Sequence, residues 1–135
     1  MRCFDADVLV HYFVGYEPTK HQQALQLVQE AVEQKTYSVS LLGVQETIFV
    51  MAKLKAPLAE INDALKQLLL AKPIGYEIAD FNRAAQFAQH IGVQNINDCL
   101  HVALAEARGC AELITYNRKD FVRLQPFTSV KIIIL

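Results

Sequence analysis

The chain has 135 residues, of which 53% are hydrophobic, and its formal net charge at pH 7 is −1. This length predicts one domain, residues 1–135, and the composition excludes a disordered chain, which combines low hydrophobicity with high net charge. Proteins that bind nucleic acid only through non-specific phosphate contacts are usually basic. Any nucleic-acid substrate must therefore be held by local positive charge or through bound metal ions.

The first half of the chain alternates between strand-like and helix-like patterns. Residues 2–5 (RCFD) predict a short strand that ends in an acid, and residues 8–13 (VLVHYF) fit either a short helix or a continued strand. Pro18 can open a helix at its first turn, and an apolar stripe follows it. Residues 36–40 (TYSVS) predict a second strand, which ends in a serine placed to cap a helix over about 41–54.

The second half of the chain continues the alternation. Apolar stripes predict a helix between Pro57 and Pro73 and another that stops at Gly92, with a weak strand candidate at 74–78. A helix over about 97–108 is apolar nearly all round and should be central. Further strands are predicted at 112–115 and 130–135. Strands alternating with helices predict a three-layer α/β/α sandwich around a mainly parallel sheet.

The cysteines and the apolar runs bear on the setting of the protein. Cys3, Cys99 and Cys110 are odd in number and show no C-x-x-C spacing. With no secretory leader, this pattern predicts a reducing, cytoplasmic setting in which the cysteines are small buried residues. No apolar run approaches the ~20 residues of a membrane span, so no membrane association is expected.

Six acidic or amide side chains are expected to gather at one edge of the sheet, because each lies at a strand end or early in a helix that follows. They are Asp5, Asp7, Glu46, Asp98, Asn117 and Asp120. Carboxylates brought together without a cation raise one another's pKa. Such hard oxygen ligands suit Mg²⁺ or Mn²⁺, and one or two of these ions can promote phosphodiester hydrolysis.

Each acid also has a purely structural interpretation. Asp98 can complement a helix N-terminus, which is worth about 0.3–1 kcal/mol. Glu46 can be a solvated helix residue, although its helix is largely apolar. Asp5 is the hardest to explain in this way, because an acid among apolar neighbours at a buried strand end needs a partner. A shared metal site explains the convergence better than separate structural roles.

Three segments resemble motifs of the PIN-domain family. FDADVLVHYF (residues 4–13) resembles its opening motif, in which an acid ends the first strand. SVSLLGVQETIFVM (38–51) resembles the segment that carries the second acid. INDCLHVALAEARGCAELITYNRKDF (96–121) is similar to the third acid on a helix, followed by a strand and a Thr-x-Asp/Asn signature. The resemblance covers nearly the whole chain in the right order.

The resemblance implies a Mg²⁺- or Mn²⁺-dependent endoribonuclease on a compact α/β/α fold. Small stand-alone members look like VapC-type toxins, which cleave RNA, form homodimers and are neutralised by a cognate antitoxin. Carried over to this sequence, Asp5, Glu46 and Asp98 would be the catalytic acids and metal ligands. Asp7 would lie beside them, and Thr115 would support the site through its hydroxyl group.

The fourth acid of the family often occupies the position of Asn117, which is an amide here. Either Asp120 takes part in the site, or the site has three strong acids plus Asp7. A neutral amide attracts a second cation less strongly than a carboxylate does. We therefore expect one tightly held ion, with any second ion arriving together with the RNA phosphate.

Several other residues near the acids allow more than one interpretation. Arg118 and Lys119 are candidates for contacts with RNA phosphates, although exposed basic residues are often only solvated. His101 lies three residues after Asp98, and a core or rim histidine is favoured over a catalytic one. The apolar stripes at 18–34 and 58–71 suit a dimer face or an antitoxin groove, or else simply cover the sheet.

Two rival functions are compatible with parts of the sequence. The Asp5-x-Asp7 string also resembles the nucleophile loop of haloacid-dehalogenase-type phosphatases, with Ser40 and Lys72 as further candidates. That class also needs a late acidic pair, which the chain lacks. The third interpretation is a PIN fold that binds RNA or protein without cutting, and Asn117 is the only feature that favours it.

Overall fold

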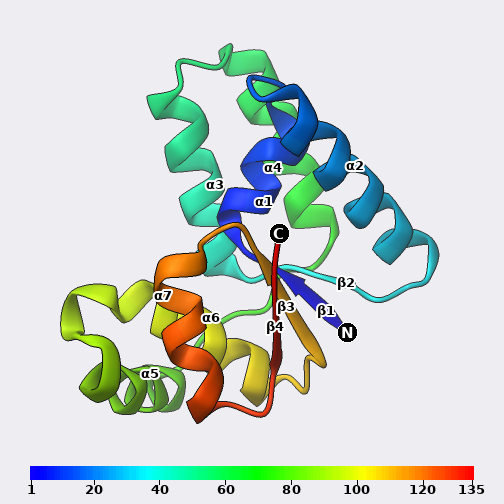
Figure 1. The fold of residues 1–135 in the computed structure, drawn as a ribbon. Coiled ribbons are helices and arrows are strands. Elements are labelled where there is room, and N and C mark those ends of the chain that lie inside the picture. Colours follow the sequence, from blue (N-terminus) through cyan, green and yellow to red (C-terminus); the bar gives the residue numbers. More distant parts are fainter.

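The computed structural model describes all residues from 1 to 135, and its centre is a four-stranded sheet (Figure 1). The strands are β1 Arg2–Phe4, β2 Tyr37–Ser38, β3 Glu112–Thr115 and β4 Lys131–Ile134. Their order in the sheet is β2-β1-β3-β4, and every neighbouring pair is parallel. The predicted three-layer α/β/α architecture with a parallel sheet is confirmed.

Seven α-helices surround this sheet. They are α1 Ala6–Phe13, α2 Pro18–Glu33, α3 Leu41–Lys53, α4 Leu58–Leu70, α5 Ile78–Ile91, α6 Ile96–Ala107 and α7 Arg118–Leu124. Short 3-10 turns follow α5 and α7. None of these helices combines the length and the apolar character that crossing a membrane requires.

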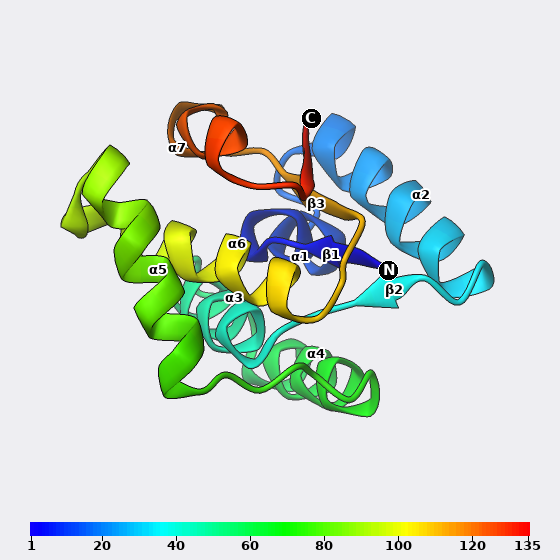
Figure 2. The ribbon, with the colours of Figure 1, turned by 90° about the horizontal axis from the view of Figure 1, so that it is seen from below.

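Side-chain alternation along the strands divides the core in two. Cys3 and Leu113 point to one face of the sheet and pack against residues of α5, α6 and α7. Phe4 and Ile114 point to the other face and pack mainly against α1, α2 and α3. Figure 2 shows β1 and β3 between α2 on one side and α5 and α6 on the other. The two inner strands are therefore covered on both faces, as expected of a parallel sheet.

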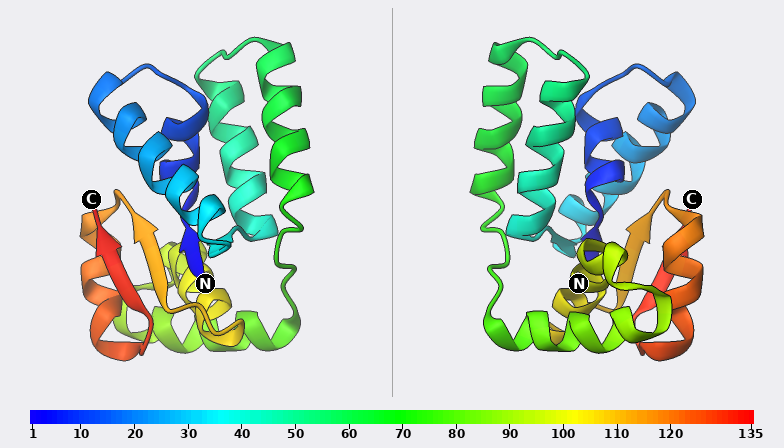
Figure 3. Two further views of the ribbon diagram at one scale, coloured as in Figure 1. Left: turned by 90° about the vertical axis from the view of Figure 1, so that its right-hand side faces the viewer. Right: turned by 90° about the vertical axis from the view of Figure 1, so that its left-hand side faces the viewer.

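Local hydrogen bonds decide where the first helices begin. The Asp5 side chain accepts a hydrogen bond from the Ala6 amide, so residues 6–13 form a helix rather than a continued strand. The Ser40 hydroxyl accepts from the Gly43 amide at 2.9 Å, as predicted, and it starts α3. This cap also explains why β2 is shorter than predicted. Figure 3 shows α3 and α4 as neighbouring helices that extend away from the sheet.

The structure differs from the sequence prediction at two elements. The strand candidate at 74–78 is reduced to a single parallel bridge between Ser40 and Ile74, because Glu77 and Asp80 form a capping box that starts α5. Helix α7 was not predicted. It begins because the Asn117 side chain accepts a hydrogen bond from the Asp120 amide, which gives this short segment a cap.

All three cysteines are buried, as expected of small apolar residues. Cys3 and Cys110 are paired as a disulfide in the structure, with Cα atoms 6.3 Å apart, while Cys99 is free. This pairing corrects the expectation of three unpaired thiols. Spacing gave no sign of it, because the two residues are 107 positions apart and become neighbours only when β1 pairs with β3.

Candidate active site

The carboxyl ends of β1 and β3 meet at the Asp5 side chain. The pairing of Phe4 with Ile114 places Asp5 beside Thr115, and the Asp5 amide donates to the Ile114 carbonyl oxygen at 2.9 Å. Asp5 Oδ2 then accepts from the Thr115 hydroxyl at 2.8 Å, and Oδ1 accepts from the Ala6 amide at 2.7 Å. Asp5 is only 6% exposed, so these donors hold a buried carboxylate in one orientation.

Asp7 lies two residues after Asp5, in the first turn of α1, and only one of its carboxylate oxygens has hydrogen-bond partners. Its Oδ2 atom accepts from the Tyr116 amide at 3.1 Å and lies 3.3 Å from the Thr115 hydroxyl. Its Oδ1 atom is buried and has no hydrogen-bond partner. Burial, together with the negative charge of Asp5, raises the pKa of Asp7 to about 7. A bound cation would supply the partner that this oxygen lacks.

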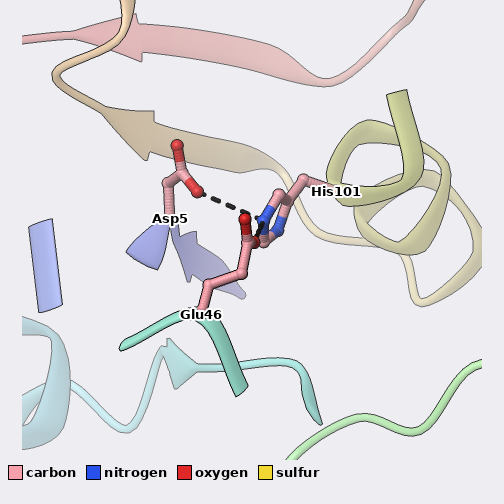
Figure 4. A group of neighbouring side chains, drawn as sticks. All are labelled: Asp5, Glu46 and His101. Atoms are coloured by element: carbon pink, nitrogen blue, oxygen red, sulfur yellow. Dashed lines mark hydrogen bonds and ion pairs between the residues drawn. The ribbon is translucent and has the colours of Figure 1, made fainter. Parts of the chain in front are cut away.

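Glu46 and His101 reach the same point from two helices, as Figure 4 shows. The Nε2 atom of His101, on α6, hydrogen-bonds to Glu46 Oε1, on α3, and lies 3.3 Å from Asp5 Oδ1. Burial lowers the pKa of His101, but the charges of Asp5 and Glu46 outweigh it and raise that pKa to about 9. The sequence favoured a structural histidine at this position, whereas the structure places its imidazole between two carboxylates.

Asp98, Asn117 and Asp120 form the other half of the cluster. The Asn117 amide nitrogen Nδ2 lies 3.4 Å from Asp98 Oδ2 and 3.3 Å from Asp120 Oδ2, and it donates toward both. Burial, with the charges of Asp5 and Asp120, raises the pKa of Asp98 to about 7. Asp120 therefore lies beside Asp98, with the Asn117 amide between them as a neutral bridge.

A cavity of about 250 Å³ opens onto this cluster. Its polar lining includes Asp5, Asp7, Glu46, Asp98 and Asn117. A larger depression of about 850 Å³ lies against α2, but glutamines and glutamates on that one exposed helix line most of it. The smaller cavity is the one in which side chains from several elements converge, so it is the candidate active site.

The donor set fits a divalent cation. Ligand atoms of Asp5, Glu46 and His101 all lie within 4.8 Å of one another. Metal–ligand bonds of about 2.1 Å place ligand atoms about 3 Å apart when they are adjacent and about 4.2 Å apart when they are opposite. The unpartnered Oδ1 atom of Asp7 is a further acceptor in this cavity that a cation could engage.

The structure brings all six predicted acid and amide residues to one edge of the sheet, with Thr115 beneath Asp5 and Asp7. Arg118 and Lys119 are exposed in the first turn of α7, next to Asn117. His101, for which the sequence favoured a core or rim role, lies in the same cluster of side chains. Its i+3 spacing from Asp98, which puts both on one helix face, was the available signal.

The phosphatase alternative is not favoured by this geometry. Neither Ser40 nor Lys72 lines the cavity. The Ser40 hydroxyl caps α3, and no lysine lies among the lining residues to neutralise an attacked phosphate. Both oxygens of Asp5 are engaged by donors, which suits a fixed ligand better than a nucleophile.

We expect the Thr115→Val variant to lose stability at this site. The substitution keeps the side-chain shape and leaves the buried Asp5 Oδ2 without its hydroxyl donor, which costs about 1–3 kcal/mol in the free energy of unfolding. Urea unfolding in EDTA measures the effect. Thr47→Val is the matched control, since that buried hydroxyl only donates to the Gly43 carbonyl within α3. Equal losses in the two variants would show that the Thr115 hydroxyl does not hold Asp5.

Comparisons with known proteins agree with this fold. The family model described as PIN domain matches residues 2–125. The chain is also similar to a crystal structure of VapBC2 from Rickettsia felis bound to a DNA fragment from their promoter. That likeness has a TM-score of 0.67 at 14% identity and covers 99% of this chain and 98% of the other. A comparison with curated proteins finds no match.

The fold is thus that of an α/β/α protein with a carboxylate-lined cavity at the end of its parallel strands. Because the family model spans nearly the whole chain, the protein belongs to the PIN-domain family.

Proposed function

We propose that the protein is a divalent-metal-dependent endoribonuclease that hydrolyses RNA phosphodiester bonds with Mg²⁺ or Mn²⁺. The observation that carries this proposal is the convergence of Asp5, Glu46 and Asp98, from three different elements, on one cavity at the carboxyl edge of the sheet. Carboxylates gathered this closely in a partly buried cavity are costly without a cation. Among the chemistries open to a PIN fold, metal-assisted phosphodiester hydrolysis uses this donor set most directly.

The proposal gives each residue a role. Asp5, Glu46 and Asp98 are the catalytic metal ligands, and Thr115 keeps Asp5 oriented through its 2.8 Å hydrogen bond. Asp7 offers its unpartnered oxygen to a cation or to a water molecule. We propose one tightly held ion in the free protein. The reason is that a neutral amide, that of Asn117, lies between Asp98 and Asp120 and attracts a second cation less strongly than a carboxylate would.

A divalent ion held by these residues would supply Lewis acidity and would lower the pKa of a bound water molecule. The protein's own side chains would bind the substrate. Arg118 and Lys119, both exposed beside the cavity, meet the phosphates of the RNA on either side of the scissile bond.

Two observations support a biological role: the resemblance to small PIN toxins and the structural similarity to VapBC2 from Rickettsia felis. We propose that the chain is the toxin of a toxin–antitoxin module in the cytoplasm, where it acts as a homodimer and is neutralised by a cognate antitoxin protein. The net charge of −1 agrees with RNA binding through local basic residues and metal ions rather than through overall charge.

Cleavage of a mixed RNA pool by the purified protein tests the proposal. We expect cleavage with Mg²⁺ or Mn²⁺, none with EDTA, and recovery when the metal is restored in excess. The Asp98→Asn variant, purified in parallel, should lose cleavage and thereby exclude a contaminating ribonuclease. Equal cleavage by the variant would place the activity elsewhere. A folded wild-type protein that binds RNA but cuts none would identify a binding module instead.

A further inference from the structure

His101 lies where an ion between Asp5 and Glu46 would need a third ligand. Its side chain is only 3% exposed, and its Nε2 atom faces a carboxylate oxygen of each acid. The three side chains come from the end of β1, from α3 and from α6, and they point toward one another in Figure 4. The backbone elements therefore fix an imidazole nitrogen and two carboxylate oxygens around one point.

We propose that His101 is a direct nitrogen ligand of this ion and that it makes the site select Mn²⁺ over Mg²⁺. The inference rests on the proposed function for the presence of a divalent ion at this site. It adds two claims: that His101 coordinates the ion, and that the site therefore prefers Mn²⁺ to Mg²⁺. Both can be measured without any cleavage assay.

The ligand chemistry sets the direction of the preference. Mg²⁺ binds oxygen ligands and keeps much of its water, so it gains little from an imidazole. Mn²⁺ accepts carboxylates and imidazole together, and it follows Mg²⁺ closely in size and coordination number. A set of two carboxylates and one histidine therefore favours the transition-metal ion, whereas a site of acids and amides alone does not.

The surroundings of His101 argue against a purely packing role. Residues on both sides of it in α6, including Leu100, Val102 and Leu104, are buried and apolar. An aliphatic residue would fill this position without the cost of burying a polar ring. The remaining alternative is that His101 only forms ion pairs that position Asp5 and Glu46. In that case its nitrogen stays outside the coordination sphere when the metal binds.

Pulsed electron paramagnetic resonance of the Mn²⁺-loaded protein separates these two cases. A directly bound imidazole gives a ¹⁴N coupling on Mn²⁺, which changes to the ¹⁵N pattern when the protein is labelled with ¹⁵N-histidine. We expect this coupling in the wild-type protein and its loss in His101→Gln, which keeps a hydrogen-bond donor for the two acids. His11→Gln is the matched control, since His11 lines the same cavity from α1 and the coupling should survive there.

Metal titration by calorimetry tests the selectivity. The wild-type protein should bind Mn²⁺ more tightly than Mg²⁺, and His101→Gln should lose about tenfold or more in Mn²⁺ affinity with little loss for Mg²⁺. Thermal unfolding of the metal-free proteins checks that the variant folds. If it does not, the coupling in wild type and its persistence in His11→Gln still decide the question.

Mn²⁺ bound to the wild-type protein without a ¹⁴N coupling would overturn the proposal, and so would a coupling that disappears in His11→Gln. These results are independent of the nuclease test. RNA cleavage without the coupling would refute the role of His101 alone. The coupling without RNA cleavage would support the role of His101 and refute the proposed function.

Discussion

The Asp5→Asn variant is expected to cut RNA about 1,000-fold more slowly than the wild-type protein, which corresponds to about 4 kcal/mol of transition-state stabilisation. Asp5 acts on both halves of the site, because its charge raises the pKa of Asp7 and of Asp98 and its Oδ1 atom lies 3.3 Å from His101 Nε2. An amide removes the anionic oxygen that holds the ion. Single-turnover cleavage at saturating Mn²⁺ measures the loss.

The fold should survive this substitution. The asparagine oxygen can still accept from the Ala6 amide, and its NH₂ group can donate to the Thr115 hydroxyl, which can turn toward Asp7. Asp63→Asn, on the exposed surface of α4, is the matched control and should leave cleavage unchanged. Wild-type rates in a folded Asp5→Asn protein would remove Asp5 from the active site.

The metal-free protein should lose stability as the pH rises from about 5.5 to about 8.5. The pKa of Asp7 is raised from 3.8 to about 7 and that of Asp98 likewise, in each case first by burial and then by the charge of Asp5. Groups with raised folded-state pKa values favour folding below their unfolded-state pKa, and that contribution disappears as the pH passes the folded-state value. His101 acts in the same direction, since its pKa is raised from 6.5 to about 9.

The size of this effect is about 2 kcal/mol for one carboxyl group, because between about pH 5.5 and its folded-state pKa of about 7 the folded protein keeps a proton that the unfolded chain has already lost. Urea unfolding in EDTA at the two pH values measures it, and Asp7→Asn should flatten the pH dependence. Added Mn²⁺ should restore stability at the higher pH, because an ion that binds only the folded state stabilises it. Equal stability at both pH values in EDTA would contradict the charge distribution described for this site.

Periodicity and capping residues were sufficient to predict most of the fold. The strands at β1, β3 and β4 and the helices α2 to α6 lie near their predicted positions, because apolar stripes and caps act over a few residues. Helix α7 was not predicted, because its seven residues are too few to show an apolar stripe. The pairing of Cys3 with Cys110 depends on strand order, which no local pattern contains.

The residues of the candidate site could be predicted from the sequence, but the distances between them could not. Acids that follow parallel strands must gather at one edge, so Asp5 and Asp98 could be grouped from the sequence. The distances between side chains depend on how α3 and α6 cross the sheet. For this reason the position of His101 between Asp5 and Glu46 emerged only from the structure. The placing of Asp120 beside Asp98 likewise required the unpredicted turn into α7.

The most direct test of metal-assisted hydrolysis at the acidic cluster is RNA cleavage in ¹⁸O-labelled water with Mg²⁺ or Mn²⁺, followed by mass analysis of the product ends. We predict that each cut places one ¹⁸O atom in the single terminal phosphate that it creates, with an unlabelled hydroxyl at the other new end. No 2′,3′-cyclic phosphate should form, since water rather than the 2′-hydroxyl attacks phosphorus. Cleavage that yields a cyclic phosphate, or that continues in EDTA, would contradict this account.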